Sequence, residues 1–176
     1  MIILYVLNYS KLNDVIIEKY INNFIKLLKA NEINNEFKIK FCDMGTKNRF
    51  LEHIDRSVKT VFDNINVIKE VNDYINFKSN NQDIQKHKLV FLGEFLKTSS
   101  PWGEATDCMA VIKEVQEKVV WHEISHLIGA SDHYDDDFSA LSICKDPQHC
   151  IMTYGKLEGV FCTQSIQEMK NYLETI

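Results

Sequence analysis

The sequence has few of the features that mark disordered or nucleic-acid-binding chains. Only two of its 176 residues are proline and six are glycine, whereas 45% are hydrophobic and 26% are charged, a composition typical of an ordinary folded protein. Arginine occurs only at Arg49 and Arg56, lysine is spread along the chain, and the formal net charge is −5. A basic stripe of the kind that binds nucleic acid is therefore absent. The length fits one domain with a sizeable core.

A long apolar run near the N-terminus is also missing. Residues 1–7 are apolar, but seven residues are too few to span a membrane. The run has neither the basic start nor the small-residue cleavage site of a secretory signal, so a buried first strand explains it better. We expect a cytoplasmic protein with no membrane partner, although a secreted fragment stripped of its leader would look the same.

The number of cysteines is odd, and no secretory signal accompanies them. Under those conditions thiols or metal ligands are favoured over a disulfide framework. Three of the five fall late in the chain. The cysteines are Cys42, Cys108, Cys144, Cys150 and Cys162.

Hydrophobic spacing predicts the secondary structure. Strands are expected over residues 2–8, 36–42, 88–96 and 107–113, and helices over residues 11–30, 114–128 and 163–174. Ser10 is a candidate N-cap for the first helix, and Gly129 ends the second. Residues 49–78 favour a helix in their first half and either type beyond Ile65. Residues 76–87 are expected to form a loop, and residues 130–162 to be irregular.

One short segment carries recognisable chemistry, the string His122-Glu-Ile-Ser-His126. On a helix, residues four apart lie on the same face, so both imidazoles can reach one metal ion. Glu123 lies beside that ion, where it can take a proton from a metal-bound water. With a third protein ligand and one open position, this is the arrangement of a catalytic zinc site. Zinc lowers the pKa of its water toward ~7 and polarises a scissile carbonyl.

The alternative is that the two histidines lie on the surface of a core helix. A chance HExxH string has a probability of about 1–2% in a chain of this composition. Gly129 follows His126 by three residues, and the ligand-type residue Asp132 follows three later, which lowers the chance level more than about a hundredfold. The whole string therefore favours the metal site.

This string resembles the extended motif of the metzincin clan of zinc metallopeptidases, in which a third ligand follows the glycine by three residues. Gly129 would let the chain turn out of the helix, because glycine tolerates positive φ. Spacing then favours Asp132 as third ligand, as in snapalysin-type sequences that end in Asp-His-Tyr. His133, one residue later, competes because imidazole is the commoner zinc ligand.

Two further residues follow from that resemblance. Met152, in the string Cys150-Ile-Met-Thr-Tyr-Gly155, resembles the clan's Met-turn, which forms an apolar floor beneath the ligands. Tyr154 resembles the astacin and serralysin tyrosine, which approaches the metal or stabilises the oxyanion. Ordinary core packing is the alternative for Met152, and a buried tyrosine without a catalytic part is the alternative for Tyr154.

A closer resemblance, over roughly the last 90 residues, is to the archaemetzincins. In that family four cysteines hold a second, structural zinc. Cys150 and Cys162 match two of them, whereas His133 stands at the first cysteine position and Ser165 at the last. With Cys144 as substitute, a site of Cys144, Cys150, Cys162 and His133 is reasonable. Unbound thiols, or a Cys144–Cys150 disulfide, remain alternatives.

The resemblance implies an α+β fold of the α/β type, with a mixed twisted sheet packed on a backing helix and an active-site helix, and a small irregular C-terminal lobe that ends in a helix. One catalytic domain would cover residues 1–176, divided into 1–129 and 130–176. The strand before the zinc helix, residues 102–112, would lie at the sheet's edge and pair with an extended peptide. The implied activity is that of a monomeric zinc metallopeptidase acting on peptides or proteins. A weak or inactive peptide-binding protein and a hydrolase of a non-peptide amide are the alternatives.

Overall fold

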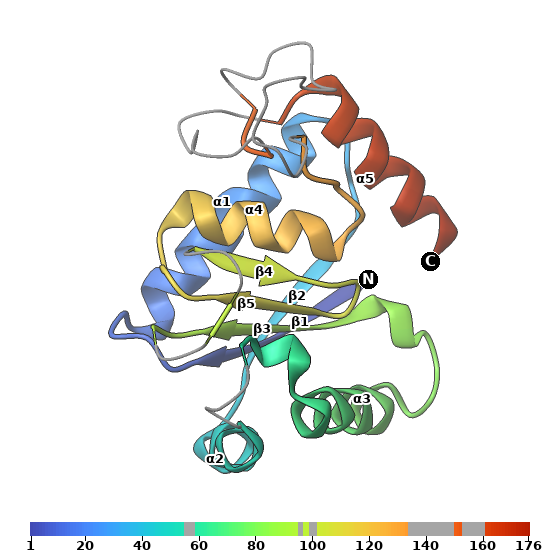
Figure 1. Ribbon diagram of the computed structural model, residues 1–176. Helices are drawn as coiled ribbons and strands as arrows, with labels where there is room; N and C mark the ends of the chain where they lie inside the picture. The colour runs from blue at the N-terminus through green and yellow to red at the C-terminus, as the bar shows by residue number, and fades with distance from the viewer. Residues whose placement is uncertain (55–58, 95–96, 99–101, 134–149, 153–160) are drawn as a thin grey trace.

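Five strands form a single mixed sheet in the computed structural model, which describes residues 1–54, 59–94, 97–98, 102–133, 150–152 and 161–176. The spatial order is β2-β1-β3-β5-β4 (Figure 1). Neighbouring strands run parallel except β4, which runs antiparallel to β5, so the expected mixed sheet is confirmed. The strands are β1 (Ile2–Asn8), β2 (Phe37–Phe41), β3 (His87–Leu92), β4 (Gly103–Ala105) and β5 (Met109–Ile112).

Helices cover both faces of this sheet (Figure 1). One face packs against α1 (Asp14–Ala30) and α4 (Glu117–Leu127), with α5 (Thr163–Thr175) joining the same core. The other packs against α2 (Met44–His53) and α3 (Ile65–Ser79). Alternation along β1 explains this, because Leu4 and Val6 point to the first core and Tyr5 and Leu7 to the second. A strand buried on both faces has a continuous apolar sequence, as β1 does.

Helix α1 begins three residues later than the earliest expected position. Its N-cap is Asn13, whose side chain accepts a hydrogen bond from the Ile16 N–H at 3.0 Å. Ser10 is not the cap, because its hydroxyl donates to Asn8 Oδ1 at 2.7 Å instead. The buried residues Ile17, Ile21, Phe24 and Leu28 follow the expected helical spacing.

The ambiguous stretch from residue 49 to 78 contains the end of α2, a short 3-10 turn and most of α3, so the part beyond Ile65 is helical. Asp43 caps α2 and Asn64 caps α3, with a short 3-10 turn at Val61–Asp63 before the second cap. The loop expected at 76–87 is wrong at both ends, since α3 continues to Ser79 and a 3-10 turn at Ile84–Lys86 precedes β3. Asn80, which has φ 53°, provides the left-handed residue that ends α3.

The expected edge strand, residues 102–112, is two strands joined by a tight turn. The Thr106 N–H donates to the Met109 carbonyl at 2.8 Å, which reverses the chain. Strand β5 therefore lies between β3 and β4, and of these two strands only β4 lies at an edge of the sheet. The expectation that the whole segment lies at the edge is wrong for β5, because polar turn residues interrupt the segment at its middle.

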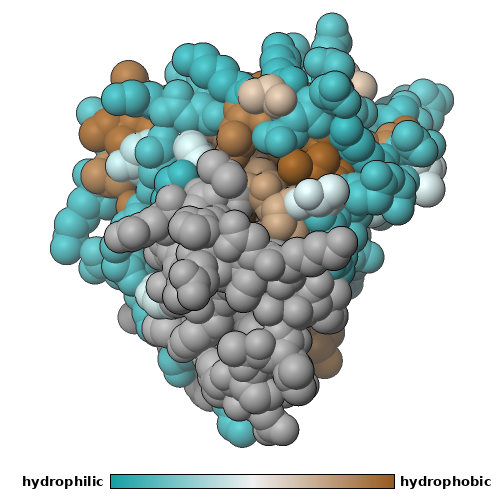
Figure 2. Space-filling view, turned by 90° about the horizontal axis from the view of Figure 1, so that it is seen from above, coloured by the Kyte–Doolittle hydropathy of each residue, from teal (hydrophilic) through white to brown (hydrophobic). Residues whose placement is uncertain are grey.

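Figure 2 shows the molecule from above, turned by 90° from the view of Figure 1. The surface in this view is mostly hydrophilic, with smaller groups of hydrophobic residues. Among the described residues, no helix has both the length and the apolar character needed to cross a membrane.

Candidate metal centre

Helix α4 carries the HExxH string and is fixed in position by α1. Its apolar face places Val120 and Ile124 in the core between helix and sheet. The Trp121 indole N–H donates to the Tyr20 carbonyl at 2.9 Å, so a polar contact also joins the two helices. These contacts fix the position of α4. Both histidines lie on its opposite face.

Three donor atoms converge at the end of α4. The Nε2 atoms of His122 and His126 lie 3.2 Å apart. Asp132 Oδ1 lies 3.3 Å from the first and 3.4 Å from the second. We call these three residues the helix cluster. The structure thus brings Asp132 to the two imidazoles, and it directs the competitor His133 elsewhere.

Backbone carbonyls set the orientation of both rings. His122 Nδ1 lies 2.8 Å from the Ile151 carbonyl, and His126 Nδ1 lies 2.8 Å from the Ala130 carbonyl. A carbonyl only accepts hydrogen bonds, so each Nδ1 carries the proton and each Nε2 presents a lone pair to the centre. This arrangement is usual for metal-ligating histidines, whose other ring nitrogen donates to a fixed acceptor.

The residues present fit a divalent metal ion. Asp132 Oδ1 is buried and has no hydrogen-bond partner, which is costly for a carboxylate oxygen unless a cation satisfies it. Two imidazole nitrogens and one carboxylate oxygen form a common zinc donor set. The pKa values reflect the same convergence: burial lowers the pKa of His122, but Asp132 and Glu123 outweigh burial and raise it. Burial raises the pKa of Asp132, but the two histidines outweigh it and hold the pKa far below its ordinary value.

Glu123 lies beside the helix cluster and against β4, an edge strand of the sheet. It is 4% exposed, and burial raises its pKa to about 7 although the two histidines lower it. A Cβ added to Gly103 on β4 would lie 2.6 Å from Glu123 Oε1. The close contact between strand and carboxylate therefore requires a residue without a side chain at position 103.

A second group of donors lies next to the first in the chain. His133 Nδ1 lies 3.6 Å from Cys150 Sγ and 3.4 Å from Cys162 Sγ. We call these three residues the sulfur cluster. Its donor atoms all lie within 4.8 Å of one another, as do those of the helix cluster. Ser165 Oγ approaches both sulfur atoms, at 3.6 Å and 3.4 Å.

Electrostatics in the sulfur cluster favour a thiolate. Burial raises the pKa of Cys150, but His133 and Ser165 outweigh burial and bring the pKa to about 6. The Cys150 contact raises the pKa of His133 to about 9, although burial opposes the change. Sulfur and imidazole donors of this kind suit zinc. Cys144, the expected fourth ligand, lies outside the described residues.

The other site residues predicted from the sequence lie in different parts of the structure. Met152 is fully buried, and its carbonyl accepts the His133 N–H at 2.9 Å, so its turn lies beside the ligand loop. Tyr154 lies outside the described residues. Gly129 has φ +97° and turns the chain from α4 toward Asp132. Cys108 is partly buried against the α3 side of the sheet, which agrees with a half-buried thiol and not with a group that faces the metal.

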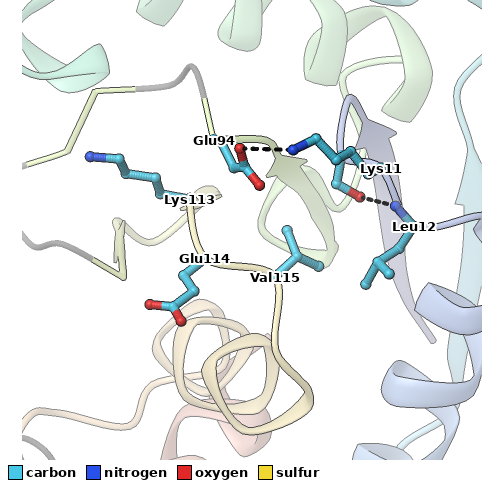
Figure 3. A pocket seen from close by; sticks show the side chains of 7 residues that line it. Lys11, Leu12, Glu94, Lys113, Glu114 and Val115 are labelled. Carbon is cyan, nitrogen blue, oxygen red and sulfur yellow. Dashed lines mark hydrogen bonds and ion pairs between the residues drawn. The ribbon is translucent and has the colours of Figure 1, made fainter.

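A pocket of about 510 Å³ lies at the carboxyl ends of β1, β3 and β5 (Figure 3). Leu12 and Val115 contribute apolar side chains, and Lys11 Nζ lies 3.6 Å from Glu94 Oε2 in an exposed ion pair. No donor of either cluster lines this pocket. The pocket is therefore separate from both clusters.

Several contributors to the site escaped the sequence reasoning. The Ile151 and Ala130 carbonyls could not be found, because any residue type supplies a carbonyl. Gly103 did carry a signal, since an isolated glycine at a strand indicates a close approach of another group. Glu168 on α5, which accepts the Ser131 N–H, resembles any other charged residue of an amphipathic helix.

No protein-family model and no curated protein sequence matches this chain. Among solved structures, the chain is similar to archaemetzincin (amzA) from Methanopyrus kandleri, with a TM-score of 0.51 and 11% sequence identity. The match covers 98% of this chain and 94% of that chain. At this identity the likeness concerns the fold alone. The chain therefore has a fold similar to that of archaemetzincin, and it carries two groups of residues that could hold metal ions.

Proposed function

We propose that this protein is a zinc metallopeptidase that hydrolyses peptide bonds at the helix cluster. The observation that carries the proposal is the convergence of three donor atoms on one point, one of them a buried carboxylate oxygen without a hydrogen-bond partner. A carboxylate with a raised pKa lies beside that point. The metallopeptidase-type fold supports the same activity.

Each residue of the site has a definite role in this proposal. His122, His126 and Asp132 hold zinc, which when bound supplies an acidified water and polarises the substrate carbonyl. Glu123 accepts a proton from the attacking water and returns it to the leaving amine. On the sequence resemblance, Tyr154 is proposed to stabilise the oxyanion and Met152 to form the floor of the site.

The edge strand supports a peptide as substrate. Within the described part of the chain, strand β4 pairs with β5 on one side and with no strand on the other, so its outer side can pair with an extended chain. Gly103 brings this strand into contact with Glu123, which would place a paired peptide next to the general base. Backbone pairing of this kind provides affinity without reading side chains.

We also propose that the sulfur cluster holds a second, structural zinc. His133, Cys150 and Cys162 supply three donors, and Cys144 is proposed as the fourth. A closed site of this type would tie α5 to the segments around residues 133 and 150. Metal counting by mass spectrometry of the intact protein tests it. Two zinc ions per chain are expected, whereas a single zinc lost on His122→Ala would refute the second site.

The activity is tested by digesting a peptide library with the zinc-loaded protein, with and without a chelator. We expect cleavage that the chelator abolishes, and we expect Glu123→Ala to keep its zinc but to lose about 100-fold or more of the activity. Peptide binding without cleavage would identify a binding protein instead. Cleavage only of small non-peptide amides would identify a different hydrolase. A Glu123→Ala variant with wild-type activity would refute the proposed role of Glu123.

A further inference from the structure

Helix α5 contributes no donor to the helix cluster, but it contacts the loop that carries one. The loop, residues 129–133, leaves α4 and passes beside α5 (Figure 1). Met169 and Leu173 bury the inner face of α5 in the main core, so the helix is a firm support. Glu168 and Tyr172 lie one turn apart on the same helix, and both reach the loop.

The first contact is at the turn of the loop. A Cβ added to Gly129 would overlap the Cβ and Cγ of Tyr172, so the side chain of Tyr172 lies directly on the backbone of the turn. The tyrosine is itself held, because Lys88 Nζ donates to its hydroxyl at 2.7 Å. Lys88 is 1% exposed on the central strand β3. The turn at Gly129 is thus connected through Tyr172 to the centre of the sheet.

The second contact is two residues further along the loop. The Ser131 N–H donates to Glu168 Oε2 at 3.0 Å, and the same oxygen lies 3.6 Å from His133 Nε2. Gln164 Nε2 donates to the other carboxylate oxygen at 3.0 Å, which fixes the rotamer of Glu168. One carboxylate on α5 therefore contacts the residues on both sides of Asp132.

Asp132 itself depends on these neighbours. Its Oδ1 atom has no hydrogen-bond partner, and the two histidine Nε2 atoms that it faces lie 3.3 Å and 3.4 Å away. The position of the oxygen follows from the backbone at residues 131–133, and that backbone is held from α5. Groups that orient a metal ligand without touching the metal commonly change metal affinity.

We propose that Glu168 and Tyr172 are positioning residues for Asp132, so that α5 sets the metal affinity of the helix cluster. The inference rests on the proposed function, namely that this cluster holds zinc. Glu168 has the larger effect, because its carboxylate contacts both neighbours of Asp132, whereas Tyr172 supports only the turn.

The test measures zinc affinity by competition with a chromophoric chelator, a readout independent of peptidase activity. The metal of the helix cluster is defined as the one that His122→Ala loses. Glu168→Ala is expected to weaken binding of this metal about tenfold. Glu168→Gln retains an oxygen that can accept the Ser131 N–H and should restore most of the affinity. Asn171→Ala, at an exposed position of the same helix, is the matched control and should not change it.

The possible results separate the two proposals. If His122→Ala binds as much metal as the wild type, the proposed function fails. If His122→Ala loses one metal but Glu168→Ala binds it with wild-type affinity, the positioning role of α5 fails alone. Circular dichroism checks that each variant folds. Should Glu168→Ala not fold, Gln164→Ala carries the test, because it removes the hydrogen bond that fixes the Glu168 carboxylate and leaves the ligand loop unchanged, and it should weaken the same metal.

Discussion

The helix cluster and the sulfur cluster are joined by one peptide bond but are built differently. Asp132 belongs to the first and His133 to the second. The side chains of His122 and His126 are 15% and 17% exposed, whereas that of His133 is completely buried. Glu123, whose pKa is raised, accompanies the first cluster, whereas a serine hydroxyl and Glu168, a carboxylate whose pKa is lowered, accompany the second.

The difference matches the two kinds of zinc site that proteins build. A catalytic site keeps an open position beside a general base, whereas a structural site is closed and rich in sulfur. Adjacent residues can serve both, because successive side chains of an extended segment point in opposite directions. The comparison teaches that the donor atoms alone do not determine the role. Exposure and the neighbouring acid–base group do.

The largest effect should come from removing one ligand of each cluster. His122→Ala should reduce peptidase activity about 1,000-fold or more, since the metal supplies several kcal/mol of transition-state stabilisation. Its thermal midpoint should change little, because His122 lies at the partly exposed face of α4. Cys162→Ser should do the reverse and lower the midpoint by several degrees while activity stays measurable.

The Cys162→Ser variant is a fair comparison because serine preserves the helix cap. Cys162 is the N-cap of α5 and its sulfur accepts the Ser165 N–H, a role that serine fills well. Activity assays and thermal unfolding of both variants check the prediction. Equal losses of activity and stability in the two would show that the clusters form one functional unit.

A smaller effect on activity alone is expected from Gly103→Ala. The added methyl group would displace the Glu123 carboxylate, and a displacement of about 1 Å can cost about 100-fold in rate. Both metals should remain bound, because no donor moves. Steady-state kinetics and metal counting check this, with Ala105→Ser on the same strand as control. Wild-type activity in Gly103→Ala would mean that the carboxylate position is not critical.

The two clusters should also differ in how fast they release metal. A chelator reaches the partly exposed helix cluster more easily than the buried sulfur cluster, so zinc release should have two phases whose rates differ about tenfold or more. Activity should disappear with the fast phase. Following zinc release and activity in the same sample tests the assignment. Loss of activity in the slow phase would reverse the roles of the clusters.

Local patterns allowed the sequence to predict one part of this arrangement. The spacing of His122 and His126 defines a common helix face, and the glycine three residues later predicts a turn toward Asp132. The central strands were also predictable, because strands buried on both faces leave long apolar runs. The mixed sheet packed on a backing helix and an active-site helix was an implication of the family resemblance, and the structure has such a sheet, with α1 and α4 on one face.

Other features of the structure leave no clear pattern in the local sequence. Ser131 and Glu168 are 37 positions apart, and nothing in either local pattern connects them. Strand β4 has only three residues, too few for a reliable alternation, which is why hydrophobic spacing predicted a strand only over residues 107–113. The separation of α2 from α3 depends on side-chain caps at Asp43 and Asn64, which propensity alone does not rank above a continuous helix.

The smallest expected effect concerns helix α5, which contacts both clusters. Cys162 is the N-cap of this helix, and Lys88 binds the hydroxyl of Tyr172 near its other end. Burial lowers the pKa of Lys88 from 10.5 to about 8, although Asp107 and Cys108 oppose the change. Between these two values the unfolded chain binds more protons than the folded chain, so the contribution of Lys88 to the free energy of unfolding rises with pH. The penalty for burying the charged amine is fully present below pH 8 and is relieved above it.

The free energy of unfolding of the wild type should therefore rise relative to that of Lys88→Met, by about 1 kcal/mol between pH 8 and pH 9. Urea unfolding at both pH values measures this, and the difference between the two proteins removes most of the contribution of other titrating groups. The window ends at pH 9 because Tyr172, whose pKa burial raises, would reduce stability at higher pH. Lys38→Met, at an exposed position of β2, should track the wild type. If Lys88→Met also tracks it, the ammonium group reaches water in the folded protein. The far end of α5 would then lack its tie to the sheet, and the turn at Gly129 would be supported by packing alone.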